Sequence, residues 1–299
     1  MRKTILAGVG CMLLCAAAPR PALAWGSLGH RLIMARAIDL LPPPLEPFFE
    51  AARDELIVRV VDPDLWRTAG WNDDANHFLN LGLAELGPDP FLALPREYGA
   101  ALEKFGPGGL ERIGTVPWRE AEMFGHLRRA FEAAQRHRPY AASDIVLFAA
   151  ASAHYLQDAY QPLHATNNYD GQLSGQSGLH ARFESELIER FAPRLTIAPV
   201  PAAPIGSPRD ATFDVLLASH RLVGGILAAD KAARAPARRY DDPYFERFFA
   251  AIEPLLARRL GEAAAATAAL IVGAWEQAGR PAMPPAPRPL GASGPSARQ

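Results

Sequence analysis

Cysteine is almost absent from the chain, and its two copies, Cys11 and Cys15, lie close to the start. A product cleaved after Ala24 would therefore contain no disulfide. No later segment is expected to be apolar enough to span a membrane, and no run alternates apolar and polar residues as strands do. There is no internal repeat. These absences predict a helical protein whose stability depends on its core and on bound ligands.

The first residues have the pattern of a secretory leader. A short basic start precedes an apolar run that ends at Ala18, and Ala22-Leu23-Ala24 fits a signal-peptidase site. We expect residues 1–24 to be removed between Ala24 and Trp25, which would make the product secreted or periplasmic. The alternative, a lipoprotein anchored at Cys15, would leave Trp25 inside the chain.

The charge balance gives no sign of a surface that binds polyanions. The chain has 31 basic and 32 acidic residues, and loss of the leader would remove three basic ones, for a net charge of about −4. About 275 residues would remain, enough for one large domain. Residues 281–299 are rich in Pro, Gly, Ser and Ala and are predicted to be disordered. The folded domain is therefore expected to span 25–280.

The hydrophobic pattern predicts an all-α fold, a single compact multi-helix domain. Apolar residues recur at helical spacing in the ranges 30–41, 45–61, 118–137, 143–161, 180–191, 210–233 and 244–278. We expect Ser143 to cap the helix that ends near Gln161, and residues 62–90 and 165–178 to be irregular.

Five of the eight histidines have spacings that suit a metal centre. His154 and Asp158 are four apart on an expected helix, and so are His180 and Glu184, so each pair shares one helix face. One such pair alone is more often a surface hydrogen bond. Two pairs with His164 between them favour metal binding, and imidazole and carboxylate are the ligands that zinc prefers when thiolate is absent.

Further candidates lie nearer the N-terminus. His77, in Asn76-His77-Phe78, would by itself be read as a loop histidine. His30 ends the segment Trp25-Gly-Ser-Leu-Gly-His30. Cleavage would give Trp25 a free amino group that can chelate zinc with its own carbonyl, and the two intervening glycines would let His30 reach the same ion. Asp62 or Asp64 can supply one more carboxylate.

Together these motifs resemble the zinc-dependent phospholipase C and single-strand-specific nuclease superfamily, from Trp25 to about Ile188. The resemblance implies an all-helical domain with a trinuclear zinc cleft. The first zinc would be held by Asp64, His77, His154 and Asp158, the second by Trp25, His30 and the shared Asp158, and the third by His164, His180 and Glu184. Asp64 is preferred to Asp62 because Pro-Asp-Leu-Trp-Arg resembles the nuclease context.

The resemblance also implies hydrolysis of a phosphodiester. A hydroxide bridging two zinc ions would attack phosphorus and release a phosphomonoester and an alcohol. Asp158 would bridge the two ions and Asp64 would orient or deprotonate the nucleophile, so these two are the expected catalytic residues. The third zinc would hold the leaving oxygen. No obligate protein partner is inferred.

The substrate stays open between a phospholipid headgroup and single-stranded nucleic acid. Phe78 stands where the nucleases place a base-stacking aromatic, although it could equally belong to the core. The Gly-Gly-Asn substrate turn of the nucleases is missing after His164, and Asn168 stands in that region instead. Phe78 and Asn168 are expected to bind substrate. The helix after His30 and the Glu184 motif follow the phospholipase form instead. Leu65 and Asp74, however, replace the aromatic residues of the phospholipase headgroup pocket. The phospholipase interpretation is preferred.

An alternative from another class is a non-catalytic zinc-binding exported protein, because metal can stabilise a fold that has no disulfide. The many carboxylates argue against it, since structural zinc sites favour cysteine. The other histidines, His126, His137 and His220, are predicted to be surface residues.

Overall fold

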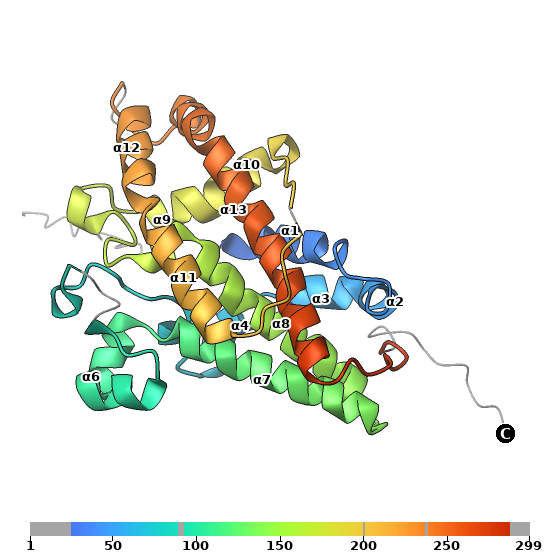
Figure 1. Ribbon diagram of the computed structural model, residues 1–299. Coiled ribbons are helices and arrows are strands. Elements are labelled where there is room, and N and C mark those ends of the chain that lie inside the picture. The colour runs from blue at the N-terminus through green and yellow to red at the C-terminus, as the bar shows by residue number, and fades with distance from the viewer. Residues whose placement is uncertain (1–24, 89–92, 200, 237–238, 288–299) are drawn as a thin grey trace, which may run out of the picture.

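Helices joined by turns and loops make up the described part of the chain, which contains no β-strand. The computed structural model describes residues 25–88, 93–199, 201–236 and 239–287 (Figure 1). The expected leader lies outside the described residues, as does the tail beyond residue 287. Residues 281–287 form an irregular segment, in which Met283 packs against the core.

The N-terminal part is built from short helices. They are α1 (Gly26–Ile38), α2 (Glu46–Ala51), α3 (Arg53–Arg59) and α4 (Asp62–Trp66), followed by the 3₁₀ turns η1 (Arg67–Ala69), η2 (Asp74–His77) and η3 (Ala84–Leu86). The helix predicted over 45–61 is broken at Ala52, where the backbone leaves helical geometry. The region 62–90, predicted to be irregular, contains α4 as well as turns.

The middle of the chain holds α6 (Tyr98–Ile113), α7 (Val116–Gln135), α8 (Ala141–Tyr160) and the turn η4 (Pro162–Ala165). Helix α6 was not predicted, because its glycines and Pro107 hide the pattern, and it is kinked at Gly106, where φ is 68°. Ser143 does not cap α8. The helix begins two residues earlier, at Ala141.

The C-terminal part contains the helices that cover the rest of the core. They are η5 (Gln172–Ser174), α9 (Leu179–Ala181), the π-helical turn η6 (Arg182–Glu186), α10 (Leu187–Phe191), η7 (Ala192–Arg194), α11 (Pro208–His220), α12 (Val223–Arg234) and α13 (Asp242–Gln277). The single helix predicted over 210–233 is interrupted between α11 and α12. Asp241 caps the 36-residue helix α13 by accepting a hydrogen bond from the backbone of Tyr244.

Helix α8 lies at the centre of this arrangement. It packs against α1, α3, α7, α11 and α13 (Figure 1), and every residue from Ala149 to Ala159 is buried. Alanines at 149, 150, 151 and 153 let neighbouring helices approach it closely. Polar side chains in this stretch of α8 are therefore buried and must find partners in the protein interior.

One such polar pair joins α7 to α8. Glu120 on α7 is fully buried, and both of its oxygens lie 3.0 Å from the hydroxyl of Ser152 on α8. Burial raises the pKa of Glu120 well above its usual value of 4.5, which favours the protonated carboxyl, and that form can donate to the serine oxygen as well as accept from the hydroxyl.

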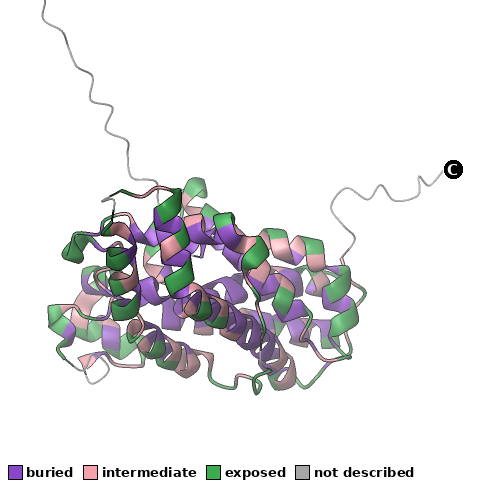
Figure 2. Ribbon diagram, turned by 90° about the horizontal axis from the view of Figure 1, so that it is seen from above, coloured by how far each residue is buried: buried purple, intermediate pink, exposed green. Residues whose placement is uncertain are grey.

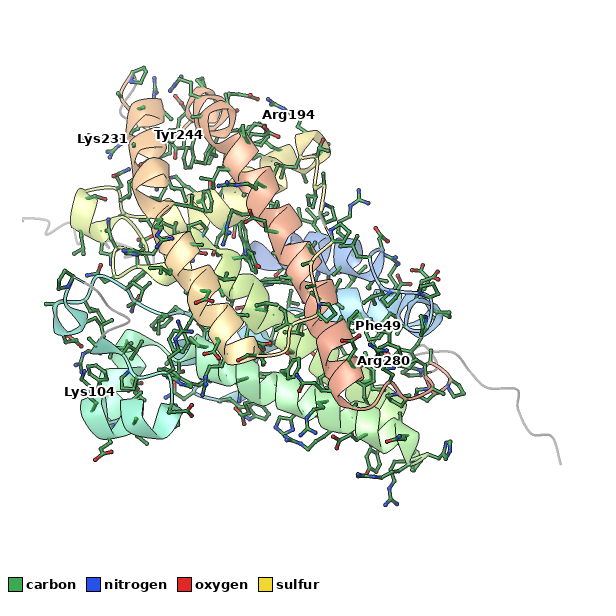
Figure 3. All side chains as sticks on the ribbon, in the orientation of Figure 1. Phe49, Lys104, Arg194, Lys231, Tyr244 and Arg280 are labelled. Carbon is green, nitrogen blue, oxygen red and sulfur yellow. The ribbon has the colours of Figure 1, made fainter. Side chains whose placement is uncertain are left out.

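The helices bury their inner faces and expose their outer ones. Figure 2 shows buried residues along the inner faces of the helices and exposed residues on the outside, and Figure 3 shows Lys104, Arg194 and Lys231 at the periphery. Tyr244 instead lies between α12 and α13, where its hydroxyl donates to Asp230. Of the three histidines predicted at the surface, His137 is exposed, whereas His126 and His220 are half-buried.

One described stretch, Pro208–Arg234, is apolar and long enough to cross a membrane by composition and length alone. The expectation that no segment after the leader would pass this test is therefore wrong. A core helix of a soluble protein passes the same test. Here α11 packs against α7 and η4, and α12 packs against α13.

Candidate metal centre

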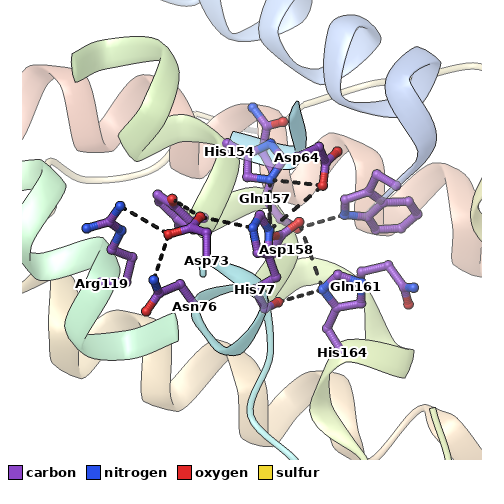
Figure 4. Close-up of polar contacts among 12 residues, drawn as sticks. Asp64, Asp73, Asn76, His77, Arg119, His154, Gln157, Asp158, Gln161 and His164 are labelled. Atoms are coloured by element: carbon purple, nitrogen blue, oxygen red, sulfur yellow. Dashed lines mark hydrogen bonds and ion pairs between the residues drawn. The ribbon is translucent and has the colours of Figure 1, made fainter. Parts of the chain in front are cut away.

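Asp158 lies at the centre of a buried group of histidines and carboxylates, the Asp158 cluster. Its members come from α1, α4, η2 and α8, and they are His30, Asp64, His77, His154 and Asp158. The Oδ2 atom of Asp158 is 2.9 Å from Nδ1 of His77 and 3.4 Å from Nε2 of His154 (Figure 4). Its Oδ1 is 3.4 Å from Nε2 of His30. One carboxylate thus joins three elements distant in sequence.

Asp64 closes the same cluster from α4. Its Oδ1 is 3.7 Å from Nε2 of His154 and 3.9 Å from Nδ1 of His77. Asp62, the alternative, is half-buried, and its Oδ2 faces Arg59 at 3.4 Å. Of these two carboxylates, Asp64 is therefore the one placed among the histidines.

A second group, the Glu184 cluster, lies beside the first. His164 from η4, His180 from α9 and Glu184 from η6 are buried together. Nε2 of His180 is 2.8 Å from Oε2 of Glu184 and 3.2 Å from Nε2 of His164. Nδ1 of His164 is 3.9 Å from Oδ1 of Asp158, so the two clusters adjoin.

The π-helical turn η6 joins a part of the helix that supplies residues of the Glu184 cluster to a part that packs in the hydrophobic core. Before and within it, His180 and Glu184 face the cluster. After it, Leu187, Ile188 and Phe191 of α10 are buried in the hydrophobic core with Trp25 and α13. A π-turn holds one more residue than an α-turn, which allows both faces to be buried at once.

Hydrogen bonds on the outer side of the imidazoles decide which nitrogen faces inward. Nδ1 of His154 is 2.8 Å from the Val60 carbonyl, and Nδ1 of His164 is 2.7 Å from the His77 carbonyl. A carbonyl can only accept, so in each neutral ring Nδ1 carries the hydrogen and Nε2 presents a lone pair to the cluster. Metal-binding histidines are commonly oriented in this way.

Glutamine side chains orient two further ligand candidates. Nδ1 of His30 lies 2.7 Å from Oε1 of Gln157, and Nε2 of Gln161 donates to Oε2 of Glu184 at 2.9 Å. The indole of Trp25 donates to the backbone carbonyl of Gln157 at 2.7 Å. Trp25 is fully buried at the start of α1, with a left-handed φ of 46°.

Several buried polar atoms in the clusters have no hydrogen-bond partner among the residues that the structure describes. They are Nε2 of His30, both carboxylate oxygens of Asp64, Oδ1 of Asp158, Nδ1 of His180 and Oε1 of Glu184. The candidate ligand atoms form three groups, and within each group they lie within 4.8 Å of one another. The groups are His30, His154 and Asp158; Asp64, His77 and His154; and His164, His180 and Glu184. Unpartnered buried donors and acceptors are rare in folded proteins and point to an ion. Nitrogen and oxygen donors of this kind fit zinc.

Ionisation in the clusters follows from burial and neighbouring charge. Burial raises the pKa of Asp64 to about 6. Burial would also raise the pKa of Asp158, but His154, His30 and His77 outweigh it and lower that pKa below its usual range. For His77, the hydrogen bonds with Asp158 and Asp73 outweigh burial and raise the pKa to about 10.

Asp73 supports His77 and was missed in the sequence. Its Oδ2 accepts from the Tyr155 hydroxyl at 2.6 Å and lies 3.2 Å from Nε2 of His77 (Figure 4). Its Oδ1 accepts from Asn76 at 2.7 Å and from Arg119 at 3.2 Å. Asp73 lies four residues before His77, but the segment between them is the 3₁₀ turn η2, in which the α-helical spacing rule does not apply.

A cleft of about 490 Å³ opens onto both clusters. Its walls are formed by Asp64, Arg67, Asp74, His77, Phe78, Asn80, Glu111, Arg112, Leu163, His164, Tyr169 and His180. Phe78, predicted to bind substrate, is half-buried in this wall. Asn168 is not among the lining residues. Its side-chain amide bonds within its own loop, to the backbone of Leu173 and to Ser174, and the next residue, Tyr169, lines the cleft instead.

No protein-family model matches the chain, and no curated protein matches its sequence. The structure itself defines an all-α domain with three buried groups of His, Asp and Glu that could hold metal ions. Every residue predicted as a metal ligand, other than Trp25, belongs to one of these groups.

Proposed function

We propose that the chain is an exported zinc-dependent hydrolase of phosphodiester bonds, of phospholipase C type. One observation carries the proposal: the Asp158 cluster brings histidines and carboxylates together beside the Glu184 cluster, and several of their buried atoms lack a hydrogen-bond partner among the described residues. Zinc ions bound there would supply a water nucleophile at neutral pH and would neutralise charge on the phosphoryl oxygens.

The chain's own residues would orient the substrate and the nucleophile. Asp64 lies in the wall of the cleft and its carboxylate has no hydrogen-bond partner, so it is available to a water or a ligand. The Nε atom of Arg67 donates to the Asp64 backbone at 3.0 Å, and this guanidinium also lines the cleft, where it can meet a phosphoryl oxygen.

Phospholipase C and nuclease activities would use the same centre. Phe78 and Tyr169 on the cleft wall favour the nuclease alternative, because aromatic rings can stack on bases. A zinc-binding protein without catalysis is the third candidate. The cleft argues against a non-catalytic protein, because His77, His164 and His180 line it, whereas structural zinc sites are closed.

A substrate panel with two neighbouring variants tests the proposal. Zinc-loaded protein should hydrolyse bis-p-nitrophenyl phosphate and phosphatidylcholine, and a chelator should abolish both reactions. Asp64→Asn should lower turnover by about 100-fold or more. The matched control Asp62→Asn, two residues away but facing Arg59, should keep it.

Two outcomes would change the assignment. Cleavage of single-stranded DNA or RNA without cleavage of lipid would select the nuclease. A protein that holds zinc and is folded, yet hydrolyses no phosphodiester, would leave only the non-catalytic alternative.

A further inference from the structure

Large apolar side chains are exposed on a segment that forms one wall of the cleft. Leu65 and Trp71 are 49% and 59% exposed, and they alternate in sequence with the lining residues Asp64, Arg67 and Asp74. The ring centroids of Trp71 and Trp66 are 5.3 Å apart and the rings are tilted by 49°, so Trp71 has an aromatic neighbour while most of its side chain stays exposed. Single exposed apolar residues need no explanation, but several beside a binding cleft do.

The segment that forms another wall carries a second apolar pair. Tyr169 lines the cleft and is 47% exposed, and Leu173 in η5 is 67% exposed. The loop is held by its own polar contacts. Oδ1 of Asn168 accepts from the backbone of Leu173 at 2.8 Å, and the Gln172 amide donates to the backbone of Asn167 at 2.8 Å. The backbone is therefore fixed while Leu173 faces water.

The charges around the cleft do not suit a polyanion. Arg67 and Arg112 are matched in the lining by Asp74 and Glu111, and Arg67 pairs with Asp74 at 3.7 Å. Nucleic-acid grooves need an excess of positive charge along the strand. Balanced charge instead complements a zwitterionic surface, whose phosphates and cations alternate.

The residue types favour a lipid surface as well. Leucine has no ring to stack on a base, whereas leucine together with tryptophan and tyrosine is typical of protein surfaces that enter the boundary between headgroups and acyl chains. We infer that Leu65, Trp71, Tyr169 and Leu173 dock the protein on a zwitterionic phospholipid surface.

Docking of this kind would bring the headgroup to the clusters while the acyl chains stay in the bilayer. Tyr169 lines the cleft, and Leu65 directly follows the lining residue Asp64 in sequence, so a phosphodiester at the docked surface would lie next to the cleft mouth. The inference rests on the proposed function, because it names a membrane phospholipid as the substrate of that site. Binding to the surface can nevertheless be measured without any cleavage.

Vesicle binding gives the direct test. Zinc-loaded protein should sediment with sucrose-loaded phosphatidylcholine vesicles, and brominated phosphatidylcholine should quench its tryptophan fluorescence. Leu173→Asp and Trp71→Asp should each weaken binding by about tenfold or more, because a charge must leave water at the docking surface. Val58→Asp is the matched control. Val58 on α3 is 59% exposed, is not part of the cleft wall, and its variant should bind as the original protein does.

A second measurement separates docking from catalysis. The ratio of turnover on phosphatidylcholine vesicles to turnover on soluble bis-p-nitrophenyl phosphate should fall about tenfold or more in Leu173→Asp and should stay constant in Val58→Asp. Circular dichroism and thermal unfolding verify that each variant is folded.

The failures are distinguishable. Hydrolysis of the soluble diester without vesicle binding, or equal binding by Leu173→Asp and Val58→Asp, overturns the docking surface and leaves the proposed function standing. Vesicle binding that depends on Leu173 and Trp71, with no diester hydrolysed, supports docking and overturns the proposed function. Binding of single-stranded oligonucleotides in place of vesicles overturns the docking surface in favour of a nucleic-acid groove.

Discussion

Helix α8 buries ionisable groups on two opposite sides, and the two sides differ in how those groups are satisfied. On one side, both carboxyl oxygens of Glu120 have a partner in the Ser152 hydroxyl, and burial raises the pKa of Glu120, which favours its neutral form. On the other side, His154 and Asp158 face buried atoms of Asp64 and His30 that have no hydrogen-bond partner among the described residues. A lone buried carboxyl can be neutralised by a proton, while converging carboxylates and imidazoles call for a cation. Burial of an acid alone is a poor indicator of a metal site.

The largest effect on the difference between the two sides of α8 is expected from removing the Asp158 carboxylate, which faces three histidines. Asp158→Asn should remove zinc from the Asp158 cluster and lower the free energy of unfolding by about 3–5 kcal/mol, because the facing histidines lose their counter-charge. For a chain of this size that loss corresponds to a melting temperature lower by roughly 10 °C. Metal analysis and calorimetry measure both effects. A variant with full zinc content would show that Asp158 is not shared between ions.

The expected amino-terminal chelate has a smaller effect, confined to one ion. Mature protein that begins at Trp25 should hold about one more zinc per chain than protein with a single residue added before it, because the addition converts the amine to an amide. Turnover should fall with the lost ion. Equal zinc content and turnover in the two forms would remove Trp25 from the set of ligands.

Asp73 should affect zinc more weakly, since it acts through His77. Asp73→Asn should reduce zinc affinity by about 10- to 100-fold, the usual effect of losing a carboxylate behind a metal-binding histidine. Asp74→Asn is the control, because Asp74 is exposed and directed to Arg67. Competition with a chromogenic chelator measures the affinities, and similar affinities for both variants would count against a supporting role for Asp73.

The smallest change in stability is expected from a substitution in the Glu120–Ser152 pair, on the other side of α8. Glu120→Gln retains a donor and an acceptor for Ser152, so its unfolding free energy at acidic pH should change by less than about 1 kcal/mol. Because the pKa of Glu120 is raised in the fold, its contribution to stability is complete below about 4.5 and is lost as the pH rises towards the folded-state pKa. The melting temperature of the original protein should therefore fall relative to Glu120→Gln between pH 4.5 and pH 8. A constant difference would mean that Glu120 is ionised in the fold.

The helical content and the two His-x-x-x-acid pairs could be predicted from the sequence because helices impose a fixed spacing. His154 with Asp158 and His180 with Glu184 are paired as that spacing requires, although the second pair reaches across a π-turn. Helix ends were less predictable, as the interruption between α11 and α12 shows. Packing against the rest of the protein decides such breaks.

The supporting residues could not be predicted, because their partners are distant in sequence or lie in irregular backbone. Gln157 contacts His30 over 127 residues, and His164 contacts the carbonyl of His77 over 87. Asn168 shows a role that its position did not indicate. Its place after His164 suggested a substrate contact, which stays a prediction, and its side-chain amide also holds the loop through Leu173 and Ser174.

The surplus residue in η6 has a consequence for what the segment can tolerate. A π-turn holds one residue more than an α-turn. Deleting one residue between Arg182 and Glu186 would restore regular backbone bonding, yet it would rotate α10 by about 100° relative to His180. Either Glu184 or the apolar face of α10 would then turn away from its place. The shortened helix would be more regular, but it would lose either a candidate metal ligand or part of its packing against the core.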